Sequence, residues 1–217
     1  MSSNMIISEQ KPFEELLDRI GPQSVFLFGC SECATLCHTG GKKELLQLEK
    51  RFRDAHVPVT GWVVLEPACS LTNNDSLFAK YEKQINKADV LIVFACGDGN
   101  QIVSELFPSK TVLSGTNTLF LGAKTSIRTF QRRCNMCGTC IVDEFNGICP
   151  ITRCPKHMLN GPCGGSENGK CEVYPEMPCV WEEIEQKAHE LGNYHNVFLH
   201  IHPAHDWSNS HLLKKER

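Results

Sequence analysis

Eight of the thirteen cysteines in this chain lie in one stretch towards its C-terminal end. They are Cys134, Cys137, Cys140, Cys149, Cys154, Cys163, Cys171 and Cys179. The first three follow a C-x2-C-x2-C spacing, which wraps a cubane cluster in bacterial ferredoxins. Eight thiols make two Cys₄ sites, so the stretch fits two [4Fe–4S] clusters or, nearly as well, one cluster and one Cys₄ zinc. The longer spacings leave open which cysteines share a site.

Three more cysteines form a second candidate site, where a predicted strand turns into a helix. They follow a C-x2-C-x3-C spacing and are Cys30, Cys33 and Cys37. A Cys₄ cluster needs a fourth thiol, and Cys69 and Cys96 each follow another predicted strand. We favour Cys96, because Gly97 and Gly99 beside it would let backbone N–H groups approach the cluster sulfurs. Cys69 is then expected to be an ordinary packed thiol.

The composition disfavours several classes of protein. The chain has 217 residues, of which 41% are hydrophobic, and a net charge of −3 with a sequence pI of about 6.3. This charge gives no electrostatic basis for binding nucleic acid or anionic lipid. The N-terminal residues lack the pattern of a signal peptide, and the apolar runs are too short to span a bilayer. We therefore expect a soluble, cytoplasmic protein, in which reduced thiols bind metal rather than form disulfides.

The elements that would position Cys30, Cys33 and Cys37 alternate between strands and helices. Short apolar runs predict strands at residues 24–29, 59–66, 89–95, 110–115 and 117–122. Apolar residues at helical spacing predict helices at 11–21, 39–56, 74–89 and 99–107. A strand that is apolar on both faces is typical of a parallel sheet covered by helices on both sides. The sequence therefore predicts an α/β fold with a Rossmann-like, doubly wound parallel sheet in residues 1–125.

The pattern changes in the segment that holds the eight cysteines. Between Cys134 and Cys179 neither a strand nor a helix period is sustained, and Gly, Pro and Cys dominate. A small domain organised by metal rather than by a hydrophobic core has this composition. We expect a cysteine-rich Fe–S/zinc domain in residues 126–192, with a helix at 180–192, and a tail at 193–217. The tail carries five of the nine histidines, for which we expect packing or partner contact rather than metal binding.

Several of these motifs together resemble one known family. The segments "RRCNMCGTC", "GICPITRCPK", "LNGPCGG" and "GKCEVYPEMPCVWEEI" are similar to the cysteine-rich domain of the MetV family, the small partner subunit of methylenetetrahydrofolate reductase in acetogenic bacteria. "FGCSECATLCHTGG" and "FACGDGNQIVSELF" resemble the N-terminal part of that family. The resemblance covers nearly residues 20 to 185, and the tail from His195 onward lies outside it.

The resemblance implies a role in reducing 5,10-methylenetetrahydrofolate to 5-methyltetrahydrofolate, a one-carbon step of the Wood–Ljungdahl pathway. A TIM-barrel, MetF-like partner would carry the flavin and the folate, and a further electron-input subunit could join the complex. This chain shows no flavin fingerprint and no catalytic set of its own, so we expect folate catalysis on the partner. Two to three [4Fe–4S] clusters, with zinc as an alternative at one site, would make this chain an electron-transfer subunit. The alternatives are a structural metal scaffold in the same complex and an unrelated iron–sulfur sensor or assembly factor.

Overall fold

The computed structural model describes residues 4–126 and 129–211. The chain divides into two compact units, residues 1–120 and 121–217. The first unit contains two groups of buried apolar side chains, and the second contains one. The second unit includes both the cysteine-rich segment and the histidine-rich tail.

A four-stranded parallel sheet forms the centre of the first unit, with the strand order β3-β2-β4-β5. Its strands are β2 (Val25–Cys30), β3 (Val59–Leu65), β4 (Val90–Phe94) and β5 (Thr111–Ser114). Every residue of β2 and β4 is buried, because both faces of the sheet are covered. The predicted α/β fold with a parallel sheet is confirmed.

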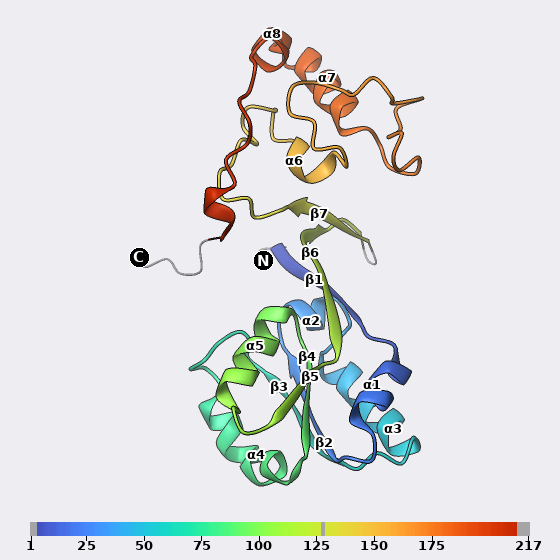
Figure 1. Ribbon diagram of the computed structural model, residues 1–217, viewed down its shortest axis with the longest axis vertical. Coiled ribbons are helices and arrows are strands. Elements are labelled where there is room, and N and C mark those ends of the chain that lie inside the picture. The colour runs from blue at the N-terminus through green and yellow to red at the C-terminus, as the bar shows by residue number, and fades with distance from the viewer. Residues whose placement is uncertain (1–3, 127–128, 212–217) are drawn as a thin grey trace. The chain divides into compact units, whose positions relative to one another are not determined.

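Helices cover both faces of this sheet (Figure 1). The helices of the unit are α1 (Phe13–Ile20), α2 (Cys33–Leu36), α3 (Lys42–Asp54), α4 (Asp75–Lys87) and α5 (Gly97–Leu106). One buried group combines side chains of α1 and α3, such as Leu16 and Phe52, with sheet residues such as Leu27. The other combines α4 and α5, through Ile85 and Val103, with the opposite sheet face. This arrangement places the carboxyl ends of β3, β2 and β4 next to one another, where ligands bind in such folds.

A second sheet has the order β1-β6-β7 and was not predicted as a separate sheet. Its strands are β1 (Asn4–Gln10), β6 (Thr116–Lys124) and β7 (Phe130–Cys134). The predicted strand at 117–122 forms within β6, but it pairs antiparallel with β7 instead of extending the parallel sheet. Only Gly115 separates β5 from β6, whereas a parallel connection needs a dozen or more residues. No pattern in the sequence predicted β1 or β7.

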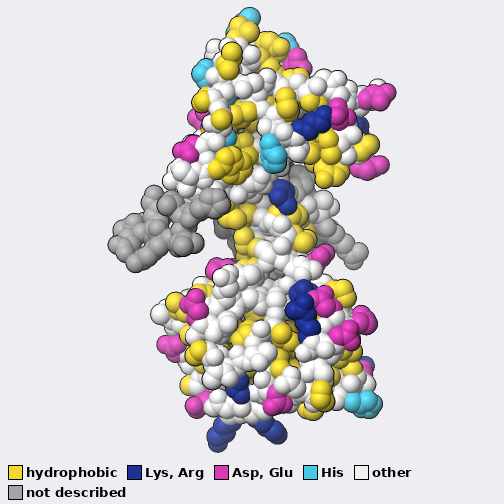
Figure 2. All heavy atoms as spheres, in the orientation of Figure 1, with side chains coloured by type: hydrophobic (Ala, Val, Ile, Leu, Met, Phe, Trp, Pro, Cys, Tyr) yellow, Lys and Arg dark blue, Asp and Glu magenta, His cyan; other side chains and the backbone are white. Residues whose placement is uncertain are grey.

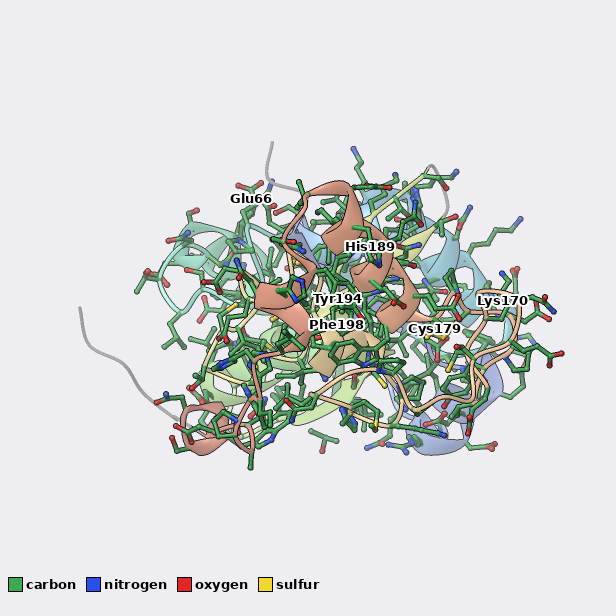
Figure 3. The ribbon with its side chains drawn as sticks, turned by 90° about the horizontal axis from the view of Figure 1, so that it is seen from above. Glu66, Lys170, Cys179, His189, Tyr194 and Phe198 are labelled. Carbon is green, nitrogen blue, oxygen red and sulfur yellow. The ribbon has the colours of Figure 1, made fainter. Side chains whose placement is uncertain are left out.

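The second unit is poor in regular structure, as its composition predicts. Its helices are α6 (Pro150–Arg153), α7 (Val180–Glu190), α8 (Tyr194–Phe198) and the 3₁₀ turn η1 (Ser208–His211). It nevertheless has a compact core, in which Phe145 and Trp181 meet edge to face with ring centroids 5.5 Å apart. Tyr194 stacks between His189 of α7 and Phe198, each at a centroid distance of 4.6 Å (Figure 3). Apolar contacts as well as metal can therefore hold this unit together.

Charged side chains of both signs are mixed on the visible face of the first unit (Figure 2). None of the helices within residues 4–126 and 129–211 combines the length and apolarity that a membrane span requires.

Candidate metal centres

Three cysteines of the first unit occupy the carboxyl ends of neighbouring parallel strands. Cys30 is the last residue of β2 and is 5% exposed. Cys96 follows β4 and is the residue immediately before α5. Cys69 follows β3 after a short turn and is exposed. Because β3, β2 and β4 are adjacent, their ends bring these three thiols to one edge of the sheet.

The thiols at this edge influence one another's ionisation. Partial desolvation raises the pKa of Cys69, and the charges of Asp98, Cys30 and Cys96 raise it further. Burial raises the pKa of Cys96, and the neighbouring Cys33 adds to this effect. Cys30, Cys33, Cys69 and Cys96 are therefore linked by electrostatic interaction. A metal cation would reverse this mutual destabilisation of thiolates by placing positive charge among them.

Backbone N–H groups at the start of α5 point to the sulfur of Cys96. Hydrogen bonds from the N–H groups of Gly99 and Asp98 lower the pKa of this thiol and partly oppose the effect of its burial. A Cβ on Gly99 would stand 2.9 Å from the Cβ of Ala68, the neighbour of Cys69. Glycine at this position thus allows α5 to approach the Cys69 turn closely.

Strand β1 reaches the same site, although the sequence did not predict it. The backbone N–H of Ile6 donates to the sulfur of Cys33 at 3.5 Å, and the thiol of Cys37 donates to the carbonyl oxygen of Ile6 at 3.7 Å. Cys33 is the first residue of α2 and Cys37 is its C-cap, so one helical turn places both thiols against β1. The predicted set of Cys30, Cys33, Cys37 and Cys96 thus gathers near one sheet edge, with Cys69 among them.

Four cysteines of the second unit line one narrow cavity of about 20 Å³. They are Cys154, Cys163, Cys171 and Cys179. Cys179 immediately precedes α7 and donates its N–H to the carbonyl oxygen of Gly169 at 2.8 Å. Cys171 donates its N–H to Met177 at 2.9 Å, closing the loop that joins it to Cys179. These backbone contacts close the loop between Gly169 and Cys179, and the cavity brings Cys154 and Cys163 to the same loop, which the cysteine spacing alone could not show.

A charged pair stands beside this cavity and was missed in the sequence. Lys156 forms an ion pair with Glu172, which lowers the pKa of that carboxyl group and raises the pKa of the lysine. The carboxylate of Glu172 also lies 3.8 Å from the sulfur of Cys163. Lys156 interacts with Cys163 as well, so a thiolate at Cys163 has a cation next to it. The signal available in the sequence was that Lys156 lies two residues after Cys154 and that Glu172 directly follows Cys171.

The remaining cysteines are Cys134, Cys137, Cys140 and Cys149. The loop after β7 is tightly turned at Met136 and Gly138, which both have positive φ. Asn135 donates to the carbonyl oxygen of Ile151 in α6 at 3.3 Å, so this loop is tied to the helix that Cys149 precedes. A Cβ on Gly138 would stand 2.3 Å from Asn209 in the tail, which covers the loop.

The described thiols are more widely spaced than in a closed zinc site. A tetrahedral Zn–S₄ site with bonds of about 2.3 Å holds its sulfurs roughly 3.8 Å apart. Within residues 4–126 and 129–211, no three cysteine sulfurs lie within 4.8 Å of one another. A closed Cys₄ zinc cage would therefore require these side chains to move together.

Sequence comparison adds an independent result for the cysteine-rich region. Residues 113–208 match the family described as methylene-tetrahydrofolate reductase C terminal. The chain is thereby linked to methylene-tetrahydrofolate reductase and to one-carbon metabolism. Comparisons with curated proteins and with solved structures gave no match.

The matched segment of this methylene-tetrahydrofolate reductase domain contains all eight cysteines from Cys134 to Cys179. It also contains Lys156 and Glu172, and it extends into η1 of the tail. The five cysteines of the first unit lie outside it. The match of residues 113–208 confirms the predicted association with methylenetetrahydrofolate reductase. The ligand role of each cysteine and the metal at each centre stay predictions.

Proposed function

We propose that this chain is the electron-transfer subunit of a methylenetetrahydrofolate reductase complex, equivalent to the MetV-type small subunit. The observation that carries the proposal is the gathering of four cysteines around one cavity inside the segment that matches the reductase domain. A thiolate-rich domain suits transfer of electrons better than reduction of folate itself. We infer that reduction of 5,10-methylenetetrahydrofolate takes place on a flavin- and folate-binding partner.

In this proposal the second unit holds two centres. One uses Cys154, Cys163, Cys171 and Cys179, which share the cavity. The other uses the remaining four thiols, Cys134, Cys137, Cys140 and Cys149. Iron–sulfur clusters bound there would supply one-electron chemistry. The protein itself holds the thiols in place, partly buries them and positions charges such as Lys156 beside them.

The first unit would hold a third centre at the sheet edge. We propose Cys30, Cys33 and Cys96 as ligands together with Cys69, whose thiol interacts with two of them. Cys37, which the sequence spacing groups with Cys30 and Cys33, is the alternative to Cys69. The N–H groups of α5 that bond to Cys96 would also stabilise the negative charge of a thiolate-bound cluster.

A docking surface for the partner adjoins the cavity of the second unit. Val173, Tyr174 and Met177 lie between two of its cysteines and are 42%, 55% and 40% exposed. Apolar side chains that face solvent beside a candidate redox centre fit a protein interface better than a free surface. A partner bound there would approach the centre closely enough for direct electron transfer.

The second candidate function is a metal scaffold without a redox role. It is favoured by one observation: Cys154 and Cys179 are buried within the apolar core of the second unit, at 7% and 9% exposure. Metal bound to these residues would stabilise that core whether or not it changes oxidation state.

The experiment that separates the two functions uses the chain co-purified with its flavoprotein partner. Methyltetrahydrofolate is added anaerobically, and it gives two electrons to the partner's flavin as it is oxidised to methylenetetrahydrofolate. Electron transfer predicts that the visible absorbance of this chain then bleaches and that a viologen dye is reduced. Cys163→Ser should stop both while flavin reduction survives, and Ser166→Ala, which alters the same cavity without removing a thiol, should stop neither. Flavin reduction without any change in the metal centres of this chain would favour the scaffold.

A further inference from the structure

Three side chains of types that bind metal, none of them a cysteine, come together in the second unit. Glu144, His200 and His202 each place one ligand-type atom within 4.8 Å of the others. Oε2 of Glu144 lies 3.1 Å from Nδ1 of His202, and the His200 and His202 rings cross at 85° with centroids 4.6 Å apart. Glu144 belongs to the loop between Cys140 and Cys149, whereas the histidines belong to the tail. Residues 56 or more positions apart in sequence thus converge on one point.

His202 is held rigidly in this group. Its side chain is 6% exposed and packs against the ring of Phe145 at a centroid distance of 4.7 Å. Asn160 binds its backbone on both sides: His202 N–H donates to Oδ1 at 2.7 Å, and Nδ2 donates to the His202 carbonyl oxygen at 3.0 Å. Metal ligands in proteins are commonly fixed by such surrounding contacts.

One of the two ring nitrogens of His202 lacks a hydrogen-bond partner. Nδ1 faces Glu144, but Nε2 is buried and has no hydrogen-bond partner among the described residues. A buried polar nitrogen without a partner costs about 1–3 kcal/mol. His202 also borders a cavity of about 260 Å³, lined in addition by His157 and His205, so an ion or water has room to approach. A histidine that binds metal through one ring nitrogen commonly donates from the other to a carboxylate, a backbone carbonyl or water, so a water in this cavity would partner Nε2 while Nδ1 binds the ion.

We propose that Glu144, His200 and His202 form a binding site for a divalent transition-metal ion such as Zn²⁺, separate from the thiol centres. Two imidazoles and one carboxylate are a ligand set that zinc accepts, with a fourth position left for water. Ligands at about 2.0–2.1 Å from a tetrahedral ion lie roughly 3.4 Å apart, so small side-chain rotations suffice to close the group around it. Glu144 and His200 are exposed, which gives an ion access from solvent. The ion would fasten the tail to the loop between Cys140 and Cys149.

The chemistry distinguishes this site from the thiol centres. Imidazole and carboxylate favour borderline ions such as Zn²⁺, whereas clustered thiolates favour iron–sulfur clusters or soft ions. The proposal therefore does not depend on which metal the cysteines hold or on the electron-transfer role. It replaces the expectation, drawn from sequence alone, that the tail histidines only pack or contact a partner.

The test is a Zn²⁺ titration of the full chain with its thiol-bound metal in place, followed by measurement of zinc and iron per chain. The unaltered chain should bind one additional Zn²⁺. His200→Ala removes an exposed ligand, and Glu144→Gln keeps the size of the side chain but removes its charge. Each should weaken binding of that ion by about tenfold or more without changing the iron content. His195→Ala, an exposed histidine of the same tail, is the matched control and should bind as the unaltered chain does.

A second measurement follows the tail itself. Zn²⁺ should slow proteolysis of the tail in the unaltered chain and in His195→Ala, but not in His200→Ala. The proposal is overturned if the unaltered chain takes up no additional Zn²⁺ or if His200→Ala binds it with unchanged affinity. It is also overturned if His200→Ala loses iron together with the zinc, because the additional ion would then depend on the thiol centres.

Discussion

The ion pair between Arg153 and Glu183 should control how readily the second unit releases its metal. Arg153 is the last residue of α6 and directly precedes Cys154. Glu183 lies in the first turn of α7, which follows Cys179. The pair therefore connects two helix ends that each carry a ligand of the same proposed centre. Arg153→Lys should loosen this connection while keeping the charge.

The contact geometry sets the size of the effect. Two charge-assisted hydrogen bonds, Nη1 to Oε2 and Nη2 to Oε1, are each 2.7 Å long. The side chains are 22% and 36% exposed, so solvent screens the pair only in part. Exposed pairs contribute about 0.2–1 kcal/mol, and a partly buried bidentate pair lies at or slightly above the upper end of that range. Lysine cannot make the bidentate contact, so we expect a loss of about 1 kcal/mol, or roughly fivefold in an equilibrium between closed and open forms.

The assay measures the rate at which a chelator removes metal from the reconstituted chain under anaerobic conditions. Arg153→Lys should release metal from one centre about fivefold faster. Arg53→Lys is the matched control, because Arg53 pairs with Glu49 on the surface of α3 in the first unit with 58% of its side chain exposed. A double-mutant cycle with Glu183→Gln should show that the two residues act through each other. Unchanged release from Arg153→Lys, or equal acceleration in Arg53→Lys, would refute this reasoning.

Four further predictions concern single residues. Cys69→Ser should lower the metal content of the first unit while Cys37→Ser retains it, as metal analysis of matched preparations can show; the reverse result would restore the ligand set favoured by spacing. Gly138→Ala should destabilise the loop after β7 by about 1–2 kcal/mol, because φ is +87° there and the new Cβ would meet the tail; thermal unfolding of the second unit measures this. Lys156→Gln should lower the midpoint potential of the neighbouring centre in a redox titration, since it removes a positive charge beside a thiolate; an unchanged potential would argue against that proximity. Asp89→Asn should lower the melting temperature at neutral pH, because hydrogen bonds from Ser24 depress the pKa of Asp89 below 3.8 and the ionised carboxylate therefore stabilises the fold. This stabilisation is present above pH 3.8 and is lost as the pH falls through the depressed pKa, where the melting temperatures of the variant and the unaltered chain should converge.

The parallel sheet could be predicted because its strands are read from local apolar runs. Strands such as β4 are buried on both faces, and their composition alone indicates a covered sheet. Strand β1 escaped notice because its burial does not alternate regularly. Its importance lies in long-range contacts, such as the one between Ile6 and Cys33, which no local pattern encodes.

The cysteines themselves were recognisable, but their grouping depended on tertiary structure. The spacing identified Cys30, Cys33 and Cys37 as a set, yet Cys69 and Cys96 come together only because β3 and β4 both flank β2. In the second unit, the cavity depends on loop hydrogen bonds such as that from Cys179 to Gly169. The approach of Glu144 to His202 is equally non-local, and an alternating H-x-H pattern in the tail was the only hint of it.

Helix α6 is a short rigid spacer with a proposed ligand at each end. Cys149 precedes it and Cys154 follows it, so the two residues are separated by little more than one helical turn. Five residues of α-helix rise by about 7.5 Å, and hydrogen-bonded backbone of this kind resists stretching. If the two thiols serve different centres as proposed, an electron would pass between those centres over a short distance that the backbone itself fixes. Docking of a partner could then change which centre is reached first without altering the step between them.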